Sequence, residues 1–290
     1  MNYELLENES MSKHTTFRVG GLVEKYYKVY TIDGLKEILD ICNKNNEKPL
    51  IIGNGSNLLV SDKGFDQPVI EFGTGFDTIE VDGWKIKAKS GAMLSKIAKT
   101  ALENELTGFE FASGIPGTVG GAVYMNAGAY GGEMKDVVTS VRVYKNGEIL
   151  DIDGSEMQFA YRYSRAMAEE MIILEVTIEL KNGNKKDIED MMDDLNSRRR
   201  EKQPLEYPSA GSTFKRPEGY FAGKLIMDSG LAGKRIGGAM VSAKHCGFII
   251  NYENGTASDV YELIKYVQSV VKEKYGVSLE TEVKLIGDFR

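Results

Sequence analysis

Residues 112–133 read ASGIPGTVGGAVYMNAGAYGGE and contain seven glycines, with no charged side chain before Glu133. Glycine loses more backbone freedom on folding than any other residue, so such a cluster needs a gain that offsets the cost. The usual gain is a close approach of the backbone to a ligand. This stretch therefore predicts a loop that lies directly against a bound molecule.

A second glycine loop, GNGSN at residues 53–57, follows an apolar run that predicts a short buried strand. It does not match the dinucleotide-binding fingerprint, because Leu58 stands where the third glycine is needed. The chain also lacks a P-loop, since GKR at residues 233–235 has no hydroxyl after the lysine, and it lacks the hydrolase GxSxG elbow. Each loop alone could be a tight turn, but together they favour a pyrophosphate-bearing dinucleotide. Small hydroxyls that could assist are those of Ser56, Ser113 and Thr118.

The composition narrows the class of protein. A net charge of −7 argues against nucleic acid and against an acidic membrane surface as partners. With two cysteines and two histidines, the chain has no disulfide framework and we expect no metal site. No apolar run approaches the roughly 20 residues of a membrane span, and the N-terminus lacks an apolar signal region. We therefore expect a cytoplasmic protein without a membrane partner.

Hydrophobic periodicity divides the chain into three segments. In residues 1–72, Asp33 could cap a helix whose apolar face spans residues 35–42, and strands are expected at 49–52 and 58–60. In residues 73–183, alternating patterns predict strands at 79–81, 86–88 and 172–180, a helix begins near Leu94, and Asn146-Gly147 predicts a hairpin.

The third segment, residues 184–290, begins with a helix at about 185–202 that Pro204 ends. Its basic cluster, residues 198–200 with Lys202, is typical of cations at a helix C-terminus. Thr256, with Asp259 three residues later, opens a second helix, and a strand at 283–286 closes the chain. This strand could also return to the first segment. The mixture of strands and helices indicates the α+β class.

The two glycine loops, extended to GNGSNLLV at 53–60 and ASGIPGTVGG at 112–121, resemble those of the UDP-N-acetylenolpyruvoylglucosamine reductase (MurB) family. The resemblance covers nearly the whole chain in the family's order, and the short segment after Tyr163 is similar to its shorter, second type. The other motifs that carry it are TFRVGG at 16–21, MNAG at 125–128, YRYS at 161–164, QP at 203–204, GSTFK at 211–215, AGKLI at 222–226 and LETEV at 279–283.

The resemblance implies a fold of the vanillyl-alcohol-oxidase (PCMH) type. Residues 1–72 and 73–183 would form two FAD-binding subdomains, and residues 184–290 an α+β substrate-binding domain. It also implies FAD, NADPH as hydride donor and a nucleotide-sugar substrate. We expect the FAD to be noncovalent, because neither His14 nor His245 stands in the context of a covalent flavin attachment, and we expect a monomer or weak oligomer. The residues expected at the cofactor are Gly53, Asn54, Gly55, Ser56, Asn57, Leu58, Ser113, Gly114, Ile115, Pro116, Gly117, Gly120, Gly121, Asn126, Ala127 and Gly128.

The implied reaction reduces an enolpyruvyl ether to a lactyl ether in peptidoglycan precursor synthesis. Ser212 matches the family's proton donor, Arg162 the residue that polarises the substrate carboxylate, and Glu282 a second polarising or proton-handling residue. Taken alone, they could be a turn serine, a surface ion pair and a solvated carboxylate.

The resemblance places substrate-binding side chains at Tyr161, Lys202, Lys215 and Arg216. Arg216 departs from the family, which commonly has asparagine before the proline. Two other functions stay open on the residues alone: an oxygen-using oxidase on the same flavin fold, and a nucleotide-binding protein without catalysis. The GSTF and LETEV motifs discriminate against the oxidase, since they suit protonation of a carbanion.

Overall fold

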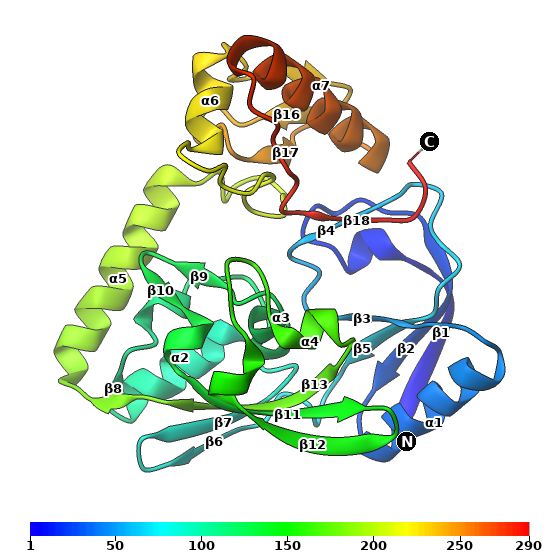
Figure 1. Cartoon of the computed structure of the whole chain (residues 1–290), viewed down its shortest axis with the longest axis vertical. Helices are drawn as coiled ribbons and strands as arrows, with labels where there is room; N and C mark the ends of the chain where they lie inside the picture. Colours follow the sequence, from blue (N-terminus) through cyan, green and yellow to red (C-terminus); the bar gives the residue numbers. More distant parts are fainter. Residues whose placement is uncertain (290) are drawn as a thin grey trace. The chain divides into compact units, whose positions relative to one another are not determined.

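The computed structural model describes residues 1–289 and is drawn in Figure 1. The chain forms two compact units. The first unit comprises residues 1–6, 26–54 and 68–199, and the second comprises residues 7–25, 55–67 and 200 onwards. Both units combine helices with strands, so the α+β class expected from the sequence is confirmed. The division into three consecutive segments stays a prediction.

The main sheet of the first unit is antiparallel. Its strands, in spatial order, are β12 (Glu148–Asp153), β11 (Val138–Lys145), β13 (Ile172–Glu179), β7 (Lys85–Lys89) and β6 (Ile79–Asp82). The turn between β11 and β12 has positive φ at both Asn146 (+50°) and Gly147 (+89°). Those values are what a two-residue Asn-Gly hairpin requires, and the predicted hairpin is confirmed.

A second sheet has the order β1 (Tyr3–Ser10), β2 (Leu22–Val29), β5 (Val69–Phe72) and β3 (Leu50–Ile52), and its last three strands are parallel. Helix α1 (Ile32–Lys44) buries the predicted apolar face, including Leu35 and Ile38. Its N-cap is Thr31, whose hydroxyl accepts a hydrogen bond from the Gly34 N–H (3.0 Å). The prediction of Asp33 as the cap is wrong, because Asp33 lies inside the first turn.

The second unit has its own core. An antiparallel sheet of β15 (Arg235–Ile236), β16 (Ala239–Val241) and β17 (Ile249–Asn251) is covered by α7 (Ala257–Tyr275), and α6 (Ala222–Asp228) packs on α7. The closing strand β18 (Lys284–Ile286) pairs in parallel with β4 (Leu58–Val60). The end of the chain therefore lies beside the strand that follows the GNGSN loop, as Figure 1 shows.

Shorter elements and the remaining helices complete the fold. They are η1 (Met11–Lys13), α2 (Leu94–Glu103), β8 (Leu106–Thr107), η2 (Glu110–Ala112), α3 (Val119–Tyr124), β9 (Gly128–Ala129), β10 (Gly132–Glu133), η3 (Met134–Asp136), η4 (Gly154–Met157), α4 (Arg165–Ala168), β14 (Lys181–Asn182) and α5 (Lys185–Lys202). Helix α3 packs on β13 and β7, which places the glycine-rich stretch on the main sheet.

The N-terminus of α7 is capped from two directions. Thr256 and Asp259 form the capping box that the sequence predicts. Asp62, 195 residues away in the chain, accepts hydrogen bonds from the N–H groups of Ala257 (2.9 Å) and Ser258 (2.8 Å). A carboxylate at this end also interacts favourably with the helix dipole. Asp62 thus joins the β4 region to α7 within the second unit.

Replacing Asp62 with alanine should lower the free energy of unfolding by about 2 kcal/mol, because two helix N–H groups lose their acceptor. Asp62→Asn should cost less, since the amide oxygen can still accept. Asp66→Ala is the matched control, because Asp66 is exposed and makes no hydrogen bond or ion pair with the described residues. Urea titration followed by circular dichroism measures all three. Equal losses for Asp62→Ala and Asp66→Ala would contradict the capping role.

Candidate active site

The two glycine loops meet in the first unit. Asn54 Nδ2 donates a hydrogen bond to the carbonyl oxygen of Pro116 (3.0 Å). A Cβ atom added to Gly53 would lie 2.4 Å from Thr118 Oγ1, closer than real Cβ contacts come. The structure therefore brings together the two loops that the sequence predicts as a ligand cradle, and it does so through a glycine.

Glycine is also required where the second loop enters α3. The Gly120 N–H donates to the carbonyl oxygen of Ser90 (3.0 Å), and a Cβ at position 120 would lie 1.8 Å from Ser90 Oγ. Thr118 caps the helix by accepting from the Gly121 N–H (3.4 Å). These contacts hold the loop against the residue that follows β7.

Several backbone donors in the loops have no acceptor among residues 1–289. They are the N–H groups of Asn54 and Gly114 in the first unit and of Gly55 and Ser56 in the second. Unpaired backbone N–H groups beside glycines are the donors that bind phosphate in other nucleotide loops. The donors in each unit are of the kind that binds a phosphate group.

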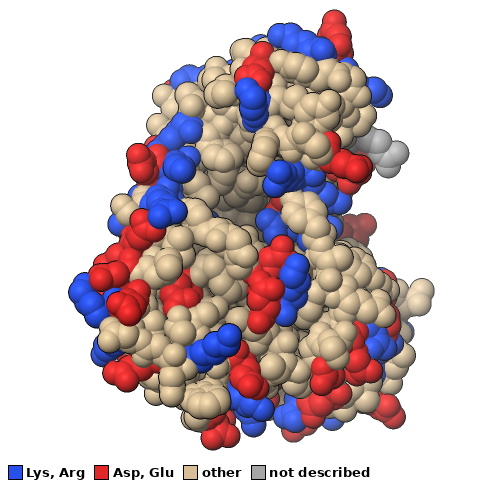
Figure 2. Space-filling view, turned by 60° about the vertical axis from the view of Figure 1, so that its left-hand side comes forward, with Lys and Arg blue, Asp and Glu red and all other residues tan. Residues whose placement is uncertain are grey.

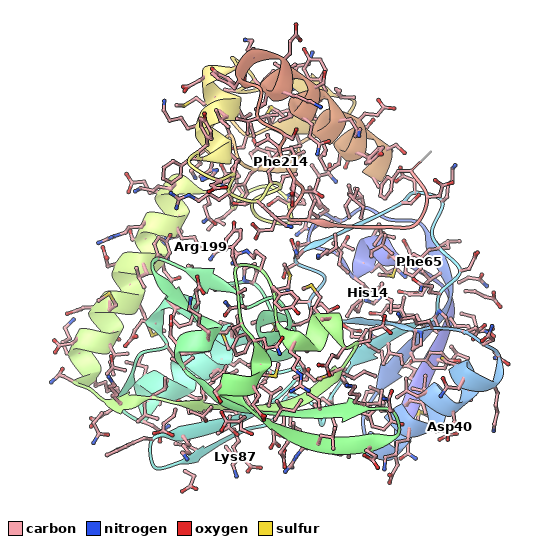
Figure 3. The ribbon with its side chains drawn as sticks, viewed as in Figure 1. His14, Asp40, Phe65, Lys87, Arg199 and Phe214 are labelled. Atoms are coloured by element: carbon pink, nitrogen blue, oxygen red, sulfur yellow. The ribbon has the colours of Figure 1, made fainter. Side chains whose placement is uncertain are left out.

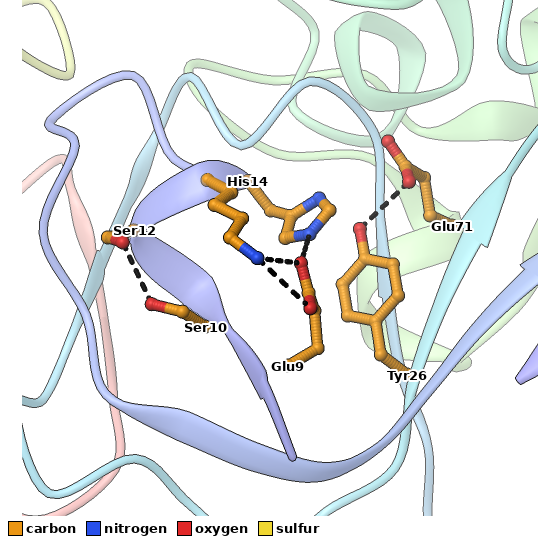
Figure 4. A network of polar contacts seen from close by, with 7 residues as sticks. Glu9, Ser10, Ser12, His14, Tyr26 and Glu71 are labelled. Carbon is orange, nitrogen blue, oxygen red and sulfur yellow. Dashed lines mark hydrogen bonds and ion pairs between the residues drawn. The ribbon is translucent and has the colours of Figure 1, made fainter. Parts of the chain in front are cut away.

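Gly55 fits tightly onto the segment that carries His14. Its φ is +59°, and a Cβ there would lie 1.9 Å from the His14 carbonyl oxygen. Figure 4 shows how this segment is held: the Glu9 carboxylate accepts from His14 Nε2 (3.0 Å) and pairs with Lys13 Nζ (3.2 Å). Burial alone would raise the pKa of Glu9, but these two partners outweigh it and the pKa is lowered. Glu9 thus holds in place the segment of Lys13 and His14 that Gly55 contacts.

A buried asparagine positions the YRYS turn. Asn126 is 1% exposed and has a φ of +46°. Its Nδ2 donates to Glu133 Oε2 (2.9 Å) and to the Ala160 carbonyl oxygen (3.0 Å), and its Oδ1 accepts from the Lys135 N–H (3.0 Å). The side-chain amide is therefore fully used within the protein. The sequence predicts Asn126 at the cofactor, and the one signal it offers for this structural role is asparagine's tolerance of positive φ.

Arg162 stands at the corner of that turn. The backbone of Ala160 and Tyr163 exchanges two hydrogen bonds (3.1 and 3.2 Å), with Tyr161 and Arg162 between them. Arg162 has a φ of +55°, and its guanidinium lies over the Tyr161 ring, 5.2 Å from the centroid. Ser164 Oγ donates to the Tyr124 carbonyl oxygen (2.8 Å) and fixes the far side of the turn. The turn is therefore held by hydrogen bonds on both sides of Arg162.

The Glu133 carboxylate lies within the electrostatic reach of Arg162. Its pKa is held below the usual value, first by the hydrogen bond from Lys135 Nζ, then by that from Asn126, with a smaller effect of Arg162. Glu133 is thus an anion at neutral pH, and the Asn126 amide separates it from the Ala160 carbonyl.

In the second unit, the GSTFK and LETEV motifs lie side by side. The Glu282 N–H donates to the Thr213 carbonyl oxygen (2.8 Å), and the Lys215 N–H donates to the Glu280 carbonyl oxygen (2.9 Å). Thr213 is anchored in turn, since its Oγ1 accepts from the Ile249 N–H (3.0 Å). Two candidate residues far apart in sequence, Ser212 and Glu282, are thereby held next to the same paired backbone.

Ser212 differs from its neighbour. It is partly exposed, and its hydroxyl makes no hydrogen bond with the described residues, whereas the Thr213 hydroxyl is engaged. Gly211 before it has a φ of +74°, and the space where a Cβ would lie is open. A partly exposed hydroxyl whose proton is not committed to the protein can donate it to a ligand.

Asn57 of the first glycine loop contacts the Glu282 backbone. Its Nδ2 donates to the Glu282 carbonyl oxygen (3.1 Å), and its own carbonyl oxygen accepts from the Lys284 N–H (2.9 Å). Asn57 is therefore hydrogen-bonded to the backbone on both sides of Val283. Sequence spacing of 225 residues gives no sign of this contact.

The predicted substrate cations occupy different surroundings. Lys215 Nζ pairs with Glu280 (3.0 Å), and the Arg216 guanidinium lies over the Phe221 ring, 4.0 Å from the centroid. Lys202 is exposed and has no partner among the described residues, and Tyr161 is 51% exposed in the first unit. Lys215 and Arg216 are thus each in contact with a neighbouring side chain, whereas Lys202 has no such partner within residues 1–289.

Two negative findings apply to the described chain. Within residues 1–289, no three His, Cys, Asp or Glu side chains form a group that could hold a metal ion. No helix in this part of the chain combines the length and apolarity needed to cross a membrane.

Known protein families match parts of both units. Residues 24–153 match an FAD binding domain, and residues 203–286 match the C-terminal domain of UDP-N-acetylenolpyruvoylglucosamine reductase. The chain is 53% identical to the reductase of that name from Caldanaerobacter subterraneus, over 98% of this chain and 94% of the relative. It is 51% identical to that of Lachnoclostridium phytofermentans, over 97% and 92%. The crystal structure of the Thermus caldophilus reductase (MurB) matches with a TM-score of 0.86 at 34% identity, covering 98% of this chain and all of that one.

Asn126→Asp should destabilise the protein at pH 7 by about 2–3 kcal/mol, because it places a second carboxylate beside Glu133 and removes two donated hydrogen bonds. The paired carboxylates would have raised pKa values in the folded state, so the loss should shrink as the pH falls from 7 towards 5. The wild type should show the opposite slope from Glu133 only below about pH 5, because a carboxylate with a lowered pKa loses its stabilisation as the pH falls through and below its unfolded-state pKa.

Asn146→Asp is the matched control, since Asn146 is also at positive φ but is exposed in a turn that accepts aspartate. Urea unfolding at pH 5, 6 and 7 measures both variants. A pH-independent loss in Asn126→Asp would argue against the electrostatic part of this account.

Proposed function

The chain belongs to the UDP-N-acetylenolpyruvoylglucosamine reductase family, and we propose that it reduces the enolpyruvyl ether of UDP-N-acetylglucosamine to the lactyl ether. The product would be UDP-N-acetylmuramate, a peptidoglycan precursor, and NADPH the hydride donor. The observation that carries this proposal is the 53% identity to a reductase of that name over 98% of the chain. The proposal includes a cytoplasmic location and a monomer or weak oligomer.

The cofactor of this chemistry is FAD, which when bound would supply the transfer of hydride from NADPH to the vinyl carbon of the substrate. We propose that the glycine loops hold it noncovalently. The unpaired N–H groups of Asn54, Gly55, Ser56 and Gly114 support this, as does the absence of Cβ atoms at Gly53 and Gly120. The other residues assigned to the cofactor are Asn57, Leu58, Ser113, Ile115, Pro116, Gly117, Gly121, Asn126, Ala127 and Gly128.

Ser212 is the proposed proton donor. Hydride addition leaves a carbanion next to the substrate carboxylate, and that carbon must receive a proton to give the lactyl ether. An alcohol is a weak acid in water, but a carbanion is basic enough to take its proton at close range. The Ser212 hydroxyl has no hydrogen-bond partner among the described residues, so its proton is not committed elsewhere.

Glu282 is proposed to handle charge or protons next to Ser212. Its backbone is fixed by the hydrogen bonds to Thr213 and Asn57, so its side chain starts from a constant position relative to the serine. A carboxylate there can orient the hydroxyl, or a bound water that restores its proton. Fixed geometry matters because a proton transfer requires the heavy atoms within about 3 Å.

Arg162 is proposed to bind the substrate carboxylate. A guanidinium presents a planar fork that suits two oxygens, and it stabilises the negative charge that develops as the carbanion forms. The Asn126 and Ser164 hydrogen bonds support this role, because they pre-set the turn. Tyr161, Lys202, Lys215 and Arg216 are proposed to bind the rest of the nucleotide sugar.

Ser212→Ala should leave NADPH-driven reduction of the flavin nearly intact and slow reoxidation by the enolpyruvyl sugar by at least about a hundredfold. Stopped-flow absorbance of the flavin separates the two half-reactions. Thr213→Val is the matched control: it removes a neighbouring hydroxyl that bonds the Ile249 N–H, so it should lower stability without changing the ratio of the half-reactions. Equal slowing of both half-reactions in Ser212→Ala would rule out the proton-donor role.

Arg162→Lys should slow the same second half-reaction and weaken binding of the enolpyruvyl sugar, because one ammonium cannot replace the bidentate fork. A loss of about tenfold to a hundredfold in kcat/KM is expected, with NADPH oxidation during flavin reduction unchanged. A variant with normal kcat/KM for the enolpyruvyl sugar would show that Arg162 does not touch the carboxylate.

A further inference from the structure

Arg199 in α5 lies directly against the second glycine loop. Figure 3 labels it on this helix. A Cβ added to Gly114 would lie 3.0 Å from Arg199 Cδ and 2.6 Å from Asn196 Oδ1. Asn196 Nδ2 also donates to Ser113 Oγ (3.3 Å). Because position 114 has no side chain, the helix approaches the loop closely and brings the guanidinium to it.

This guanidinium has no anionic partner. Within residues 1–289, no carboxylate forms an ion pair or hydrogen bond with Arg199. On the face drawn in Figure 2, Lys and Arg side chains are interspersed with Asp and Glu. The preceding residue follows that pattern, since Arg198 pairs with Asp194 at 2.7 Å.

An unpaired, partly buried charge is unfavourable. Arg199 is less exposed than Arg198, and burial lowers the pKa of its guanidinium. Buried charges in proteins are ordinarily paired, because the desolvation cost is otherwise not recovered. A ligand anion at the 113–117 loop would supply the missing partner.

We propose that Arg199 binds the diphosphate of a nucleotide ligand at the 113–117 loop, together with the unpaired N–H of Gly114. The planar fork of arginine matches two phosphate oxygens, and the N–H adds a third donor. The diphosphate belongs either to FAD or to the nucleotide sugar, and the test distinguishes the two sources. The inference rests on the proposed function, because that function is what makes FAD and the nucleotide sugar ligands of this chain.

The test compares Arg199→Gln, Arg199→Lys and the control Arg198→Gln as purified holoenzymes. Retention of FAD on dilution is followed by the fluorescence of the released flavin. Binding of UDP is followed by the change in flavin absorbance. Both are measured from about 20 to about 500 mM NaCl, which shortens the Debye length from roughly 20 Å to roughly 4 Å. In Arg199→Gln the dissociation constant of FAD or of UDP should rise about tenfold or more at low salt. Arg199→Lys should lie between, and Arg198→Gln should match the wild type.

The salt dependence separates ligand binding from a structural role. If Arg199 contacts the diphosphate, wild type and Arg199→Gln should converge at high salt, because screening removes the ionic contact. An FAD-specific loss identifies the cofactor as the source, and a UDP-specific loss identifies the nucleotide sugar. The proposal is overturned if neither constant changes, if Arg198→Gln has the same effect, or if the difference is equal at all salt concentrations.

Turnover of the enolpyruvyl sugar by the wild type and by Arg198→Gln distinguishes this failure from that of the proposed function. If both turn over the substrate while Arg199→Gln binds FAD and UDP normally, the function stands and the role of Arg199 is wrong. If the wild type binds FAD but does not reduce the enolpyruvyl sugar, the function fails independently.

Discussion

The contact between the two glycine loops is the constraint on which the first unit depends. Gly53 and Thr118 approach to a distance that no side chain at position 53 would allow, and the Asn54 amide bonds Pro116 across the same gap. The approach is possible because Gly53 has no Cβ atom, so the Thr118 hydroxyl can occupy the space that a side chain at position 53 would fill. The glycine-rich loops lose much conformational entropy on folding, and they leave backbone N–H groups without an acceptor in the described part of the protein.

Two side-chain amides hold the backbone near the catalytic candidates. Asn126 holds the turn of Arg162 in the first unit, and Asn57 holds the backbone of Glu282 in the second. An amide can donate and accept at once, so one residue bridges segments that share no secondary structure. Both asparagines belong to the glycine-rich segments, so each segment is joined by a hydrogen bond to the backbone at or near a proposed catalytic residue.

Charge is handled in two ways. Glu133 and Glu9 are surrounded by donors, which lower their pKa values and keep them ionised. Arg199 receives no such compensation from the described residues. A carboxylate that the protein satisfies serves the fold, whereas a cation that it leaves unpaired at a nucleotide loop is suited to a ligand.

Local patterns in the chain were sufficient for the α+β class, the Asn146-Gly147 hairpin, the capping box at Thr256 and the apolar face of α1, because each depends on residues close in sequence. The glycine loops were also visible, and their motifs led to the family. The cap at Thr31 was missed by two residues, since Asp33 is equally able to cap. Only the tertiary structure brought Ser212 beside Glu282, engaged the Asn126 amide and left Arg199 unpaired. These depend on hydrogen bonds and on desolvation across long separations in the chain, which spacing and composition do not encode.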